Sequence, residues 1–293
     1  MRDGRQPGVQ RSTPAARPHR FCRPPTARPR PLPVHVAPAT PQSLNAQPRP
    51  NMSTVIDPKK SLIQQIEAVA NTIPGWTPVD QLFALYSLSV ASASIGGDIV
   101  EIGSWCGRSA AILALAARAT PGTRVVAIDL FPAKEDWSEN ADGSYSFKVK
   151  LPQVGEIGGY QEQTVWKEPF ERDIAPIYAK YNSVYDVFTE SMQKHGLSDL
   201  VTAHRGDAAV ISSLPGLKAR LAFIDGDHSY DAVCRDIAQV ERALLPGGWI
   251  CFDDAFSHYD GVNRAIEDKV IGSGRYELCQ QMTRKLFVAR RRG

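Results

Sequence analysis

The sequence predicts an α/β protein with a doubly wound, mostly parallel sheet of seven strands. From residue 98 onward, short apolar runs of strand length alternate with amphipathic helical stretches, and most connections between them are short. This alternation is typical of a parallel sheet covered by helices on both faces. The last two apolar runs, 276–281 and 285–291, have no helix between them, which predicts an antiparallel hairpin at the C-terminal end of the sheet.

The spacing of apolar residues assigns the elements in order. Residues 52–97 are expected to hold leading helices, because apolar side chains recur at helical spacing over 61–73 and again over 80–95. The strands that precede the hairpin are predicted at 98–103, 124–130, 200–204, 220–225 and 248–253. The helices that alternate with them are predicted at 107–119, 185–195, 230–245 and 261–270.

Residues 98–293 are expected to form one domain with an insertion at about 132–184. The insertion is far longer than an ordinary connection, and it combines many Trp, Tyr and Phe residues with charged ones. We predict an irregular segment at the carboxyl edge of the sheet that serves as a substrate lid or an oligomer contact. The alternative is a folded excursion that only packs against the domain.

Residues 1–51 differ in composition from the rest of the chain. They carry nine Arg, no Lys and one Asp, and they hold 12 of the 22 prolines. Such a segment has too little apolar surface to fold, so we expect a disordered Arg- and Pro-rich extension. We interpret it as a dispensable extension ahead of a true start at Met52, with a targeting segment or a nucleic-acid arm as the alternatives.

Net charge and hydropathy exclude several classes of protein. The whole chain has a net charge of +3, but residues 1–51 contribute +8, so the remainder sums to −5. A mildly acidic body is a poor match for a nucleic-acid backbone, and no apolar run is long enough to span a membrane. We therefore expect neither as a partner. The five cysteines show no C-x-x-C pairing, which indicates reduced thiols and a cytoplasmic location.

The stretch EIGSWCGRS, residues 101–109, joins the first predicted strand to its helix. A Gly-rich loop at this point aims backbone N–H groups at a polar ligand. Gly103 and Gly107 are four apart, so the G-x-G-x-x-G pattern of dinucleotide sites is absent, and Trp105 stands where a pyrophosphate would need close approach. Asp129, at the tip of the second strand, can accept hydrogen bonds from both hydroxyls of a ribose. Together these features predict a site for an adenosine without a pyrophosphate.

Five motifs, EIGSWCGRS, AIDLF, HRGDA, AFIDGDHSYDAV and LLPGGWICFDDAF, carry a family resemblance. From about residue 98 to 268 the chain resembles class I S-adenosylmethionine-dependent methyltransferases, which have a Rossmann-like fold. The resembling branch is that of macrolide-sugar O-methyltransferases and cephalosporin-biosynthesis proteins. The resemblance places Glu101, Gly103 and Ser104 along the methionine moiety, Asp129 on the ribose, and Asp207 with Ala208 beside the adenine. The full set of cofactor-binding residues that we expect is Glu101, Gly103, Ser104, Gly107, Asp129, Asp207, Ala208 and Asp225.

Carboxylates gather at the tips of two neighbouring predicted strands. Asp225 ends one strand, and the pair Asp253 and Asp254 ends the next. Three carboxylates this close raise one another's pKa unless a positive group lies among them, and Mg²⁺ prefers oxygen ligands of this kind. We predict a Mg²⁺ site formed by these three residues, as the metal-dependent members of the resembling family also suggest. Such oxygen ligands accept Mn²⁺ as well.

His228 follows Asp225 by three residues and matches the position of a proposed general base in the resembling sugar O-methyltransferases. A neutral imidazole can accept the proton of a hydroxyl group. The predicted function is transfer of a methyl group from S-adenosylmethionine to a hydroxyl of a small molecule, with help from Mg²⁺. A sugar, a catechol or a natural-product intermediate would suit as the acceptor.

Three alternatives stay open at this point. The first is a methyltransferase that binds no metal, in which Asp253 and Asp254 only cap the following segment. The second is a non-catalytic protein that binds S-adenosylmethionine. The third is a nicotinamide oxidoreductase, which the missing G-x-G-x-x-G pattern and the lack of a Tyr-x-x-x-Lys pair argue against. The oligomeric state is also open, with a homo-oligomer as one outcome.

Overall fold

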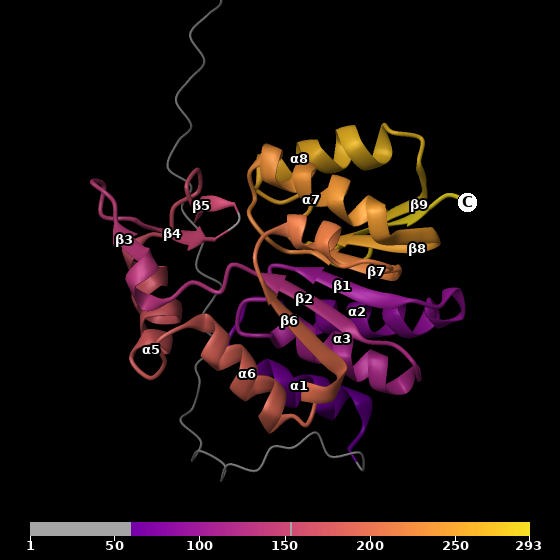
Figure 1. Cartoon of the computed structure of the whole chain (residues 1–293), viewed down its shortest axis with the longest axis horizontal. Helices are drawn as coiled ribbons and strands as arrows, with labels where there is room; N and C mark the ends of the chain where they lie inside the picture. The colour runs from indigo at the N-terminus through magenta and orange to yellow at the C-terminus, as the bar shows by residue number, and fades with distance from the viewer. Residues whose placement is uncertain (1–59, 153) are drawn as a thin grey trace, which may run out of the picture. The chain divides into compact units, whose positions relative to one another are not determined.

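The computed structural model describes residues 60–152 and 154–293 (Figure 1). The predictions for residues 1–51 and for a start at Met52 lie outside these residues. Seven strands form one sheet in the order β6-β2-β1-β7-β8-β10-β9. The strands that run parallel are β1 (Asp98–Ile102), β2 (Val125–Asp129), β6 (Val201–Arg205), β7 (Ala219–Ile224) and β8 (Leu244–Phe252). The predicted α/β sheet is confirmed.

The C-terminal hairpin lies at one edge of this sheet, as predicted. β9 (Tyr276–Gln281) and β10 (Phe287–Arg291) pair antiparallel with each other, and β10 also pairs antiparallel with β8. Phe287 lies opposite Phe252 at the end of β8. The turn of the hairpin is therefore brought to the carboxyl edge of the parallel strands.

Helices cover both faces of the sheet, and Figure 1 shows α7 and α8 on one face with α2 and α3 on the other. The bounds are α1 (Leu62–Thr72), α2 (Val79–Ala91), α3 (Arg108–Ala119), α6 (Val184–Lys194), α7 (Tyr230–Ala243) and α8 (Asp260–Ala265). Neighbouring strand residues alternate between two cores: Leu221 and Phe223 pack with the α1, α2 and α3 side, whereas Ala222 and Ile224 pack with the α7 side. Burial on both faces explains why central strands such as β2 and β7 are continuous apolar runs in the sequence.

Local sequence signals set several boundaries. Ser61 and Gln64 form a capping box that begins α1, and Ser183 with Asp186 forms another that begins α6. α7 ends at Ala243, two residues before the predicted end, and β8 begins directly after it. Pro246 accounts for the difference, because the residue before a proline disfavours helical backbone.

Shorter helical turns complete the described chain. The 3₁₀ turns are η1 (Ala93–Ile95), η2 (Lys134–Asp136), η4 (Ser198–Leu200) and η5 (Ala208–Ser213), and the π-helical turns are η3 (Phe170–Ile174) and η6 (Ile266–Ile271). η5, which we did not predict, fills the crossover between β6 and β7. No helix among the described residues has both the length and the apolar character needed to cross a membrane.

The prediction of an irregular insertion is wrong. The segment holds a three-stranded antiparallel sheet in the order β3 (Trp137–Glu139), β4 (Tyr145–Leu151), β5 (Gly155–Gly159), followed by α4 (Lys167–Pro169) and α5 (Ala175–Tyr178). The alternation of apolar and polar residues in YSFKVKL is the signal for β4, and Phe147, Val149 and Leu151 form its small core. Within the insertion, the Tyr178 hydroxyl donates to the carbonyl of Pro132 at 3.0 Å and joins α5 to the residue at which the insertion begins.

Candidate active site

The carboxyl ends of β1, β2 and β8 meet at one edge of the sheet, where the backbone is strained. Trp105, Phe131 and Asp254, which follow these three strands closely, have φ angles of +46°, +45° and +52°. Left-handed backbone is costly for residues with a side chain, and it persists at ligand-binding and catalytic sites because the surrounding structure holds it in place. This edge is the predicted location of the ligand site.

The two glycines of the loop after β1 are required by close packing. A Cβ at Gly103 would lie 2.0 Å from the carbonyl oxygen of Asp225, so the loop rests directly on the end of β7. A Cβ at Gly107 would lie 2.8 Å from the Cε of Met192 in α6. Both glycines also have positive φ, +87° and +93°. They therefore set the path of the loop, and their contact with a cofactor stays a prediction.

Glu101 and Ser104 are buried polar side chains that face this loop. Burial raises the pKa of Glu101 to about 7, against the lowering effect of the nearby Ser104 and Ser109 hydroxyls. Within the described residues, neither carboxylate oxygen of Glu101 nor the Ser104 hydroxyl has a hydrogen-bond partner of normal geometry. Buried polar atoms without a partner are costly, which indicates a ligand with polar groups at this place. The amino-acid end of S-adenosylmethionine carries such groups and fits the predicted role of both residues.

Asp129 ends β2 and holds the loop after β1 in place. Its two carboxylate oxygens accept hydrogen bonds from the backbone N–H of Trp105 at 2.9 Å and of Phe131 at 2.5 Å. Burial raises its pKa, although these two hydrogen bonds act in the opposite direction. Each oxygen keeps a further lone pair, so the carboxylate can still accept from a ribose hydroxyl as predicted.

Asp207 and Ala208 follow β6, where the adenine was predicted. Asp207 accepts a hydrogen bond from the N–H of Ala209 at 3.1 Å and thereby caps η5. Ala208 is buried. The cap gives Asp207 a structural role, and its place beside an adenine stays a prediction.

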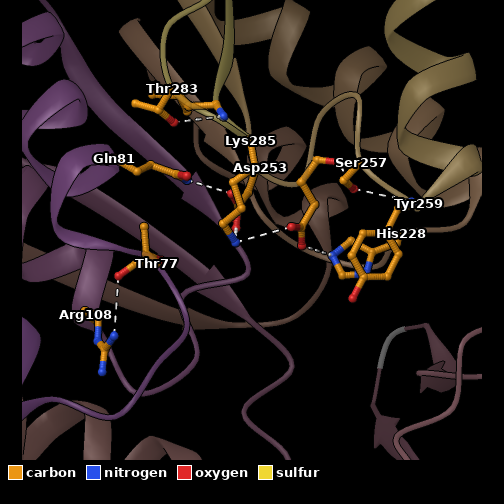
Figure 2. Close-up of polar contacts among 11 residues, drawn as sticks. Thr77, Gln81, Arg108, His228, Asp253, Ser257, Tyr259, Thr283 and Lys285 are labelled. Atoms are coloured by element: carbon orange, nitrogen blue, oxygen red, sulfur yellow. Dashed lines mark hydrogen bonds and ion pairs between the residues drawn. The ribbon is translucent and has the colours of Figure 1, made fainter. Parts of the chain in front are cut away.

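Asp225, Asp253 and Asp254 come together as predicted. Figure 2 shows that Lys285 lies beside Asp253 in this cluster. The Lys285 Nζ is 2.9 Å from Oδ2 of Asp253 and 3.3 Å from Oδ1 of Asp254. Gln81 of α2 reaches in from the other side and donates its amide to Oδ1 of Asp253 at 2.6 Å. Sequence reasoning missed both residues, because they lie far from the acidic motifs along the chain.

These contacts shift the pKa values of the cluster in different directions. Burial and the neighbouring Asp253 raise the pKa of Asp225 well above its usual value. Burial also opposes ionisation of Asp254, but the hydrogen bond with His228 and the charge of Lys285 hold the pKa of Asp254 below its usual value. Burial would lower the pKa of Lys285, yet the three carboxylates hold it above its usual range. Lys285 is therefore a permanent ammonium here.

Lys285 also bears on the Mg²⁺ site, which stays a prediction. Among residues 60–152 and 154–293, no group of three His, Cys, Asp or Glu side chains is arranged to hold a metal ion. Mg²⁺ demands near-ideal octahedral oxygen coordination, whereas the oxygens of Asp253 are engaged by an ammonium and an amide. Lys285 is the positive group that the carboxylates require. In this arrangement the carboxylate oxygens of Asp253 and Asp254 do not fit a metal ion.

His228 lies at the start of α7 and reaches the same cluster. Its Nε2 is 3.3 Å from Oδ2 of Asp254, and both side chains are largely buried. The imidazole ring packs on the ring of Tyr259, with 3.9 Å between the centroids (Figure 2). The geometry therefore joins His228 to Asp254 in one polar pair beside Lys285.

The insertion also contributes to this edge through Tyr160. Its φ is +54°, and its ring packs near Trp137 with 6.0 Å between the centroids. Burial raises the pKa of the Tyr160 hydroxyl, and the charges of Asp225, Asp129 and Asp254 add to the shift. The sequence did not reveal that Tyr160 packs with Trp137 and Phe147 in the insertion.

A family model described as a methyltransferase domain matches residues 100–255, which span β1 to the loop after β8. The chain belongs to this methyltransferase family. The match covers the loop of residues 103–107, Asp129, the crossover with Asp207 and all three acidic residues of the cluster. Together with the seven-stranded sheet and its C-terminal hairpin, it identifies a class I S-adenosylmethionine-dependent methyltransferase.

Solved structures of similar fold are also methyltransferases. The O-methyltransferase NovP has a TM-score of 0.53 and 14% identity over 73% of this chain and 81% of its own. TomG from Streptomyces achromogenes, an O-methyltransferase solved with S-adenosylmethionine, has a TM-score of 0.49 and 15% identity over 82% of this chain and 93% of its own. At 14% identity the likeness to NovP shows the shared fold alone.

Proposed function

We propose that this methyltransferase transfers a methyl group from S-adenosylmethionine to a hydroxyl of a small molecule, with His228 as the general base. The observation that carries the proposal is the His228–Asp254 pair at the edge of the sheet that also holds the unpartnered Glu101 and Ser104. The likeness to NovP, which is an O-methyltransferase, is in line with an oxygen acceptor.

The chain's own residues would divide the work between binding and proton transfer. Glu101 and Ser104 would bind the amino-acid end of the cofactor and Asp129 its ribose, while the loop after β1 holds it in place. Bound S-adenosylmethionine supplies an electrophilic methyl group on a positively charged sulfur. The protein then has two tasks: it must orient the acceptor hydroxyl toward this methyl group, and it must remove the hydroxyl proton.

His228 is suited to the second task because Asp254 fixes its ring. When Nε2–H donates to Asp254, Nδ1 carries the lone pair and can take the proton of the acceptor hydroxyl. The ionised Asp254 would then stabilise the imidazolium that forms. The sequence left open whether Mg²⁺ assists this step, and the contacts of Lys285 favour the metal-independent form.

The acceptor class follows from the insertion. Trp137, Phe147 and Tyr160 pack against one another and provide aromatic faces in the insertion. Aromatic walls with a few polar groups are typical of small-molecule sites and would suit a sugar ring or a phenol. We therefore propose a small hydroxylated acceptor.

The test is turnover by the full chain with S-adenosylmethionine and a panel of nucleotide sugars, phenols and catechols. Formation of S-adenosylhomocysteine together with a singly methylated product is the expected result. Analogues with the same ring but an already methylated hydroxyl serve as matched acceptors and should give no product. Binding of S-adenosylmethionine without turnover of any acceptor would favour the non-catalytic alternative, and failure to bind it would refute the assignment of Glu101 and Ser104.

A further inference from the structure

We infer that Lys285 is the resident cation of the acidic cluster and occupies the place that a divalent metal ion would take between Asp253 and Asp254. The inference goes beyond the proposed function, because it assigns the charge balance of the site to a residue of the hairpin turn. Its central claim, that the ammonium excludes a metal, does not depend on which acceptor is methylated.

The first support is the engagement of the carboxylate oxygens. Lys285 Nζ contacts Oδ2 of Asp253 and Oδ1 of Asp254, while His228 takes Oδ2 of Asp254 and Gln81 takes Oδ1 of Asp253. All four oxygens of the two carboxylates therefore have a partner. A metal ion could bind them only after Lys285 left, because an ion at coordination distance would lie against a second positive charge.

The second support is that Lys285 is held in place by the backbone of its turn. Its carbonyl accepts a hydrogen bond at 2.9 Å from the N–H of Ala255, the residue directly after the acidic pair. Thr283 in the same turn accepts from the N–H of Leu286 at 3.2 Å, and β10 then continues in pairing with β8 (Figure 2). The side chain of Lys285 is only 16% exposed. The ammonium is thus a fixed part of the fold.

The third support is the charge balance. Asp253 and Asp254 follow β8 directly, and the Lys285 ammonium lies within 3.3 Å of a carboxylate oxygen of each. Lys285 is thus the cation in contact with both carboxylates, while the His228 imidazole contacts Asp254 alone. Lys285 therefore supplies the compensation for which the acidic motifs predicted Mg²⁺. It also holds Asp254 toward His228, which makes it a positioning residue if the proposed function is correct.

The experiment measures Mn²⁺ binding to the full chain by electron paramagnetic resonance, with no acceptor present. The variants are Lys285→Met, Lys285→Arg and the matched control Lys148→Met, whose lysine is 57% exposed on the insertion. Far-ultraviolet circular dichroism and cooperative thermal unfolding verify that each variant is folded. We expect no saturable Mn²⁺ binding by the unmodified chain, Lys285→Arg or Lys148→Met. Lys285→Met should bind Mn²⁺ saturably, at least tenfold more tightly than any of these three proteins. The double variant Lys285→Met with Asp254→Asn should lose that binding.

Two results would overturn the inference. One is saturable binding of Mn²⁺ by the unmodified chain at the affinity of Lys285→Met. The other is a folded Lys285→Met chain that still binds no Mn²⁺, since removal of the ammonium would then not free the carboxylates. Where Lys285→Met does not fold, thermal unfolding of the unmodified chain decides: a rise in Tm with Mn²⁺ overturns the inference, and an unchanged Tm supports it. None of these readouts needs turnover, so failure of the proposed function would be seen separately.

Discussion

Gly103→Ala should damage both the stability and the cofactor site. Gly103 has a φ of +87°, and the added Cβ would lie 2.0 Å from the Asp225 carbonyl oxygen. The left-handed backbone alone costs an alanine about 1–2 kcal/mol. Relief of the clash needs a shift of about 1 Å between the loop and the end of β7, and such overpacking costs roughly 1–3 kcal/mol more. The free energy of unfolding should therefore fall by about 2–5 kcal/mol.

Gly122→Ala is the matched control, because it separates the backbone cost from the clash. Gly122 has nearly the same φ, +84°, but nothing lies within 4 Å of an added Cβ. Urea unfolding of both variants should show a loss of only about 1–2 kcal/mol for Gly122→Ala. Calorimetric titration should show S-adenosylmethionine affinity unchanged in Gly122→Ala and weakened about 10- to 100-fold in Gly103→Ala, since a displacement near 1 Å misplaces the binding groups.

Equal losses of stability in the two variants would refute this reasoning. They would mean that the loop and the end of β7 are not in the close contact described. Unchanged cofactor affinity in a destabilised Gly103→Ala chain would instead show that the loop does not bind S-adenosylmethionine.

Three further predictions concern the titratable groups. Asp254→Asn should lower kcat about 10²-fold or more with little change in S-adenosylmethionine affinity, because His228 loses the charge that fixes its ring; an equal loss in cofactor binding would contradict this. Glu101→Gln should raise the Tm of the free protein at pH 8, since a buried carboxylate is removed, and weaken cofactor binding about tenfold or more in calorimetry. Burial raises the pKa of Asp236 to about 8, so the folded state holds its proton more tightly than the unfolded state, and stability is lost as pH rises from the usual carboxyl range to about 8. Asp236→Asn should therefore be more stable than the unmodified chain at pH 9, with a smaller difference at pH 5, and a pH-independent difference in urea unfolding would count against this account.

Much of the main domain could be predicted from the sequence because its signals are local. Both faces of the sheet are buried, so strands such as β7 are unbroken apolar runs, and the helices between them have amphipathic spacing. The same reasoning placed Asp225 and Asp253 at neighbouring strand ends. The small sheet of the insertion was missed because its strands are short and separated by polar turns, although β4 alternates clearly.

The charge chemistry of the site could not be read from the acidic motifs alone. They indicated a missing positive charge, but a metal ion and a lysine both satisfy that requirement. Lys285 lies 31 residues beyond Asp254 and reaches it only because β10 pairs antiparallel with β8. Gln81 is 172 residues from Asp253 and is an ordinary helical residue in sequence. No motif indicates either residue. Finding Lys285 requires the pairing of β10 with β8, and finding Gln81 requires the position of α2 against the sheet.

The position of the hairpin at the edge of the sheet affects how the protein loses activity as temperature rises. β9 is the outermost strand of the sheet, and most of its residues are exposed, so this part of the sheet should open at a lower free energy than the central strands. Because Lys285 sits in the turn between β9 and β10, each such opening withdraws the ammonium from Asp253 and Asp254. Hydrogen exchange of the hairpin amides, rather than the global melting temperature, should then follow the loss of activity as temperature rises.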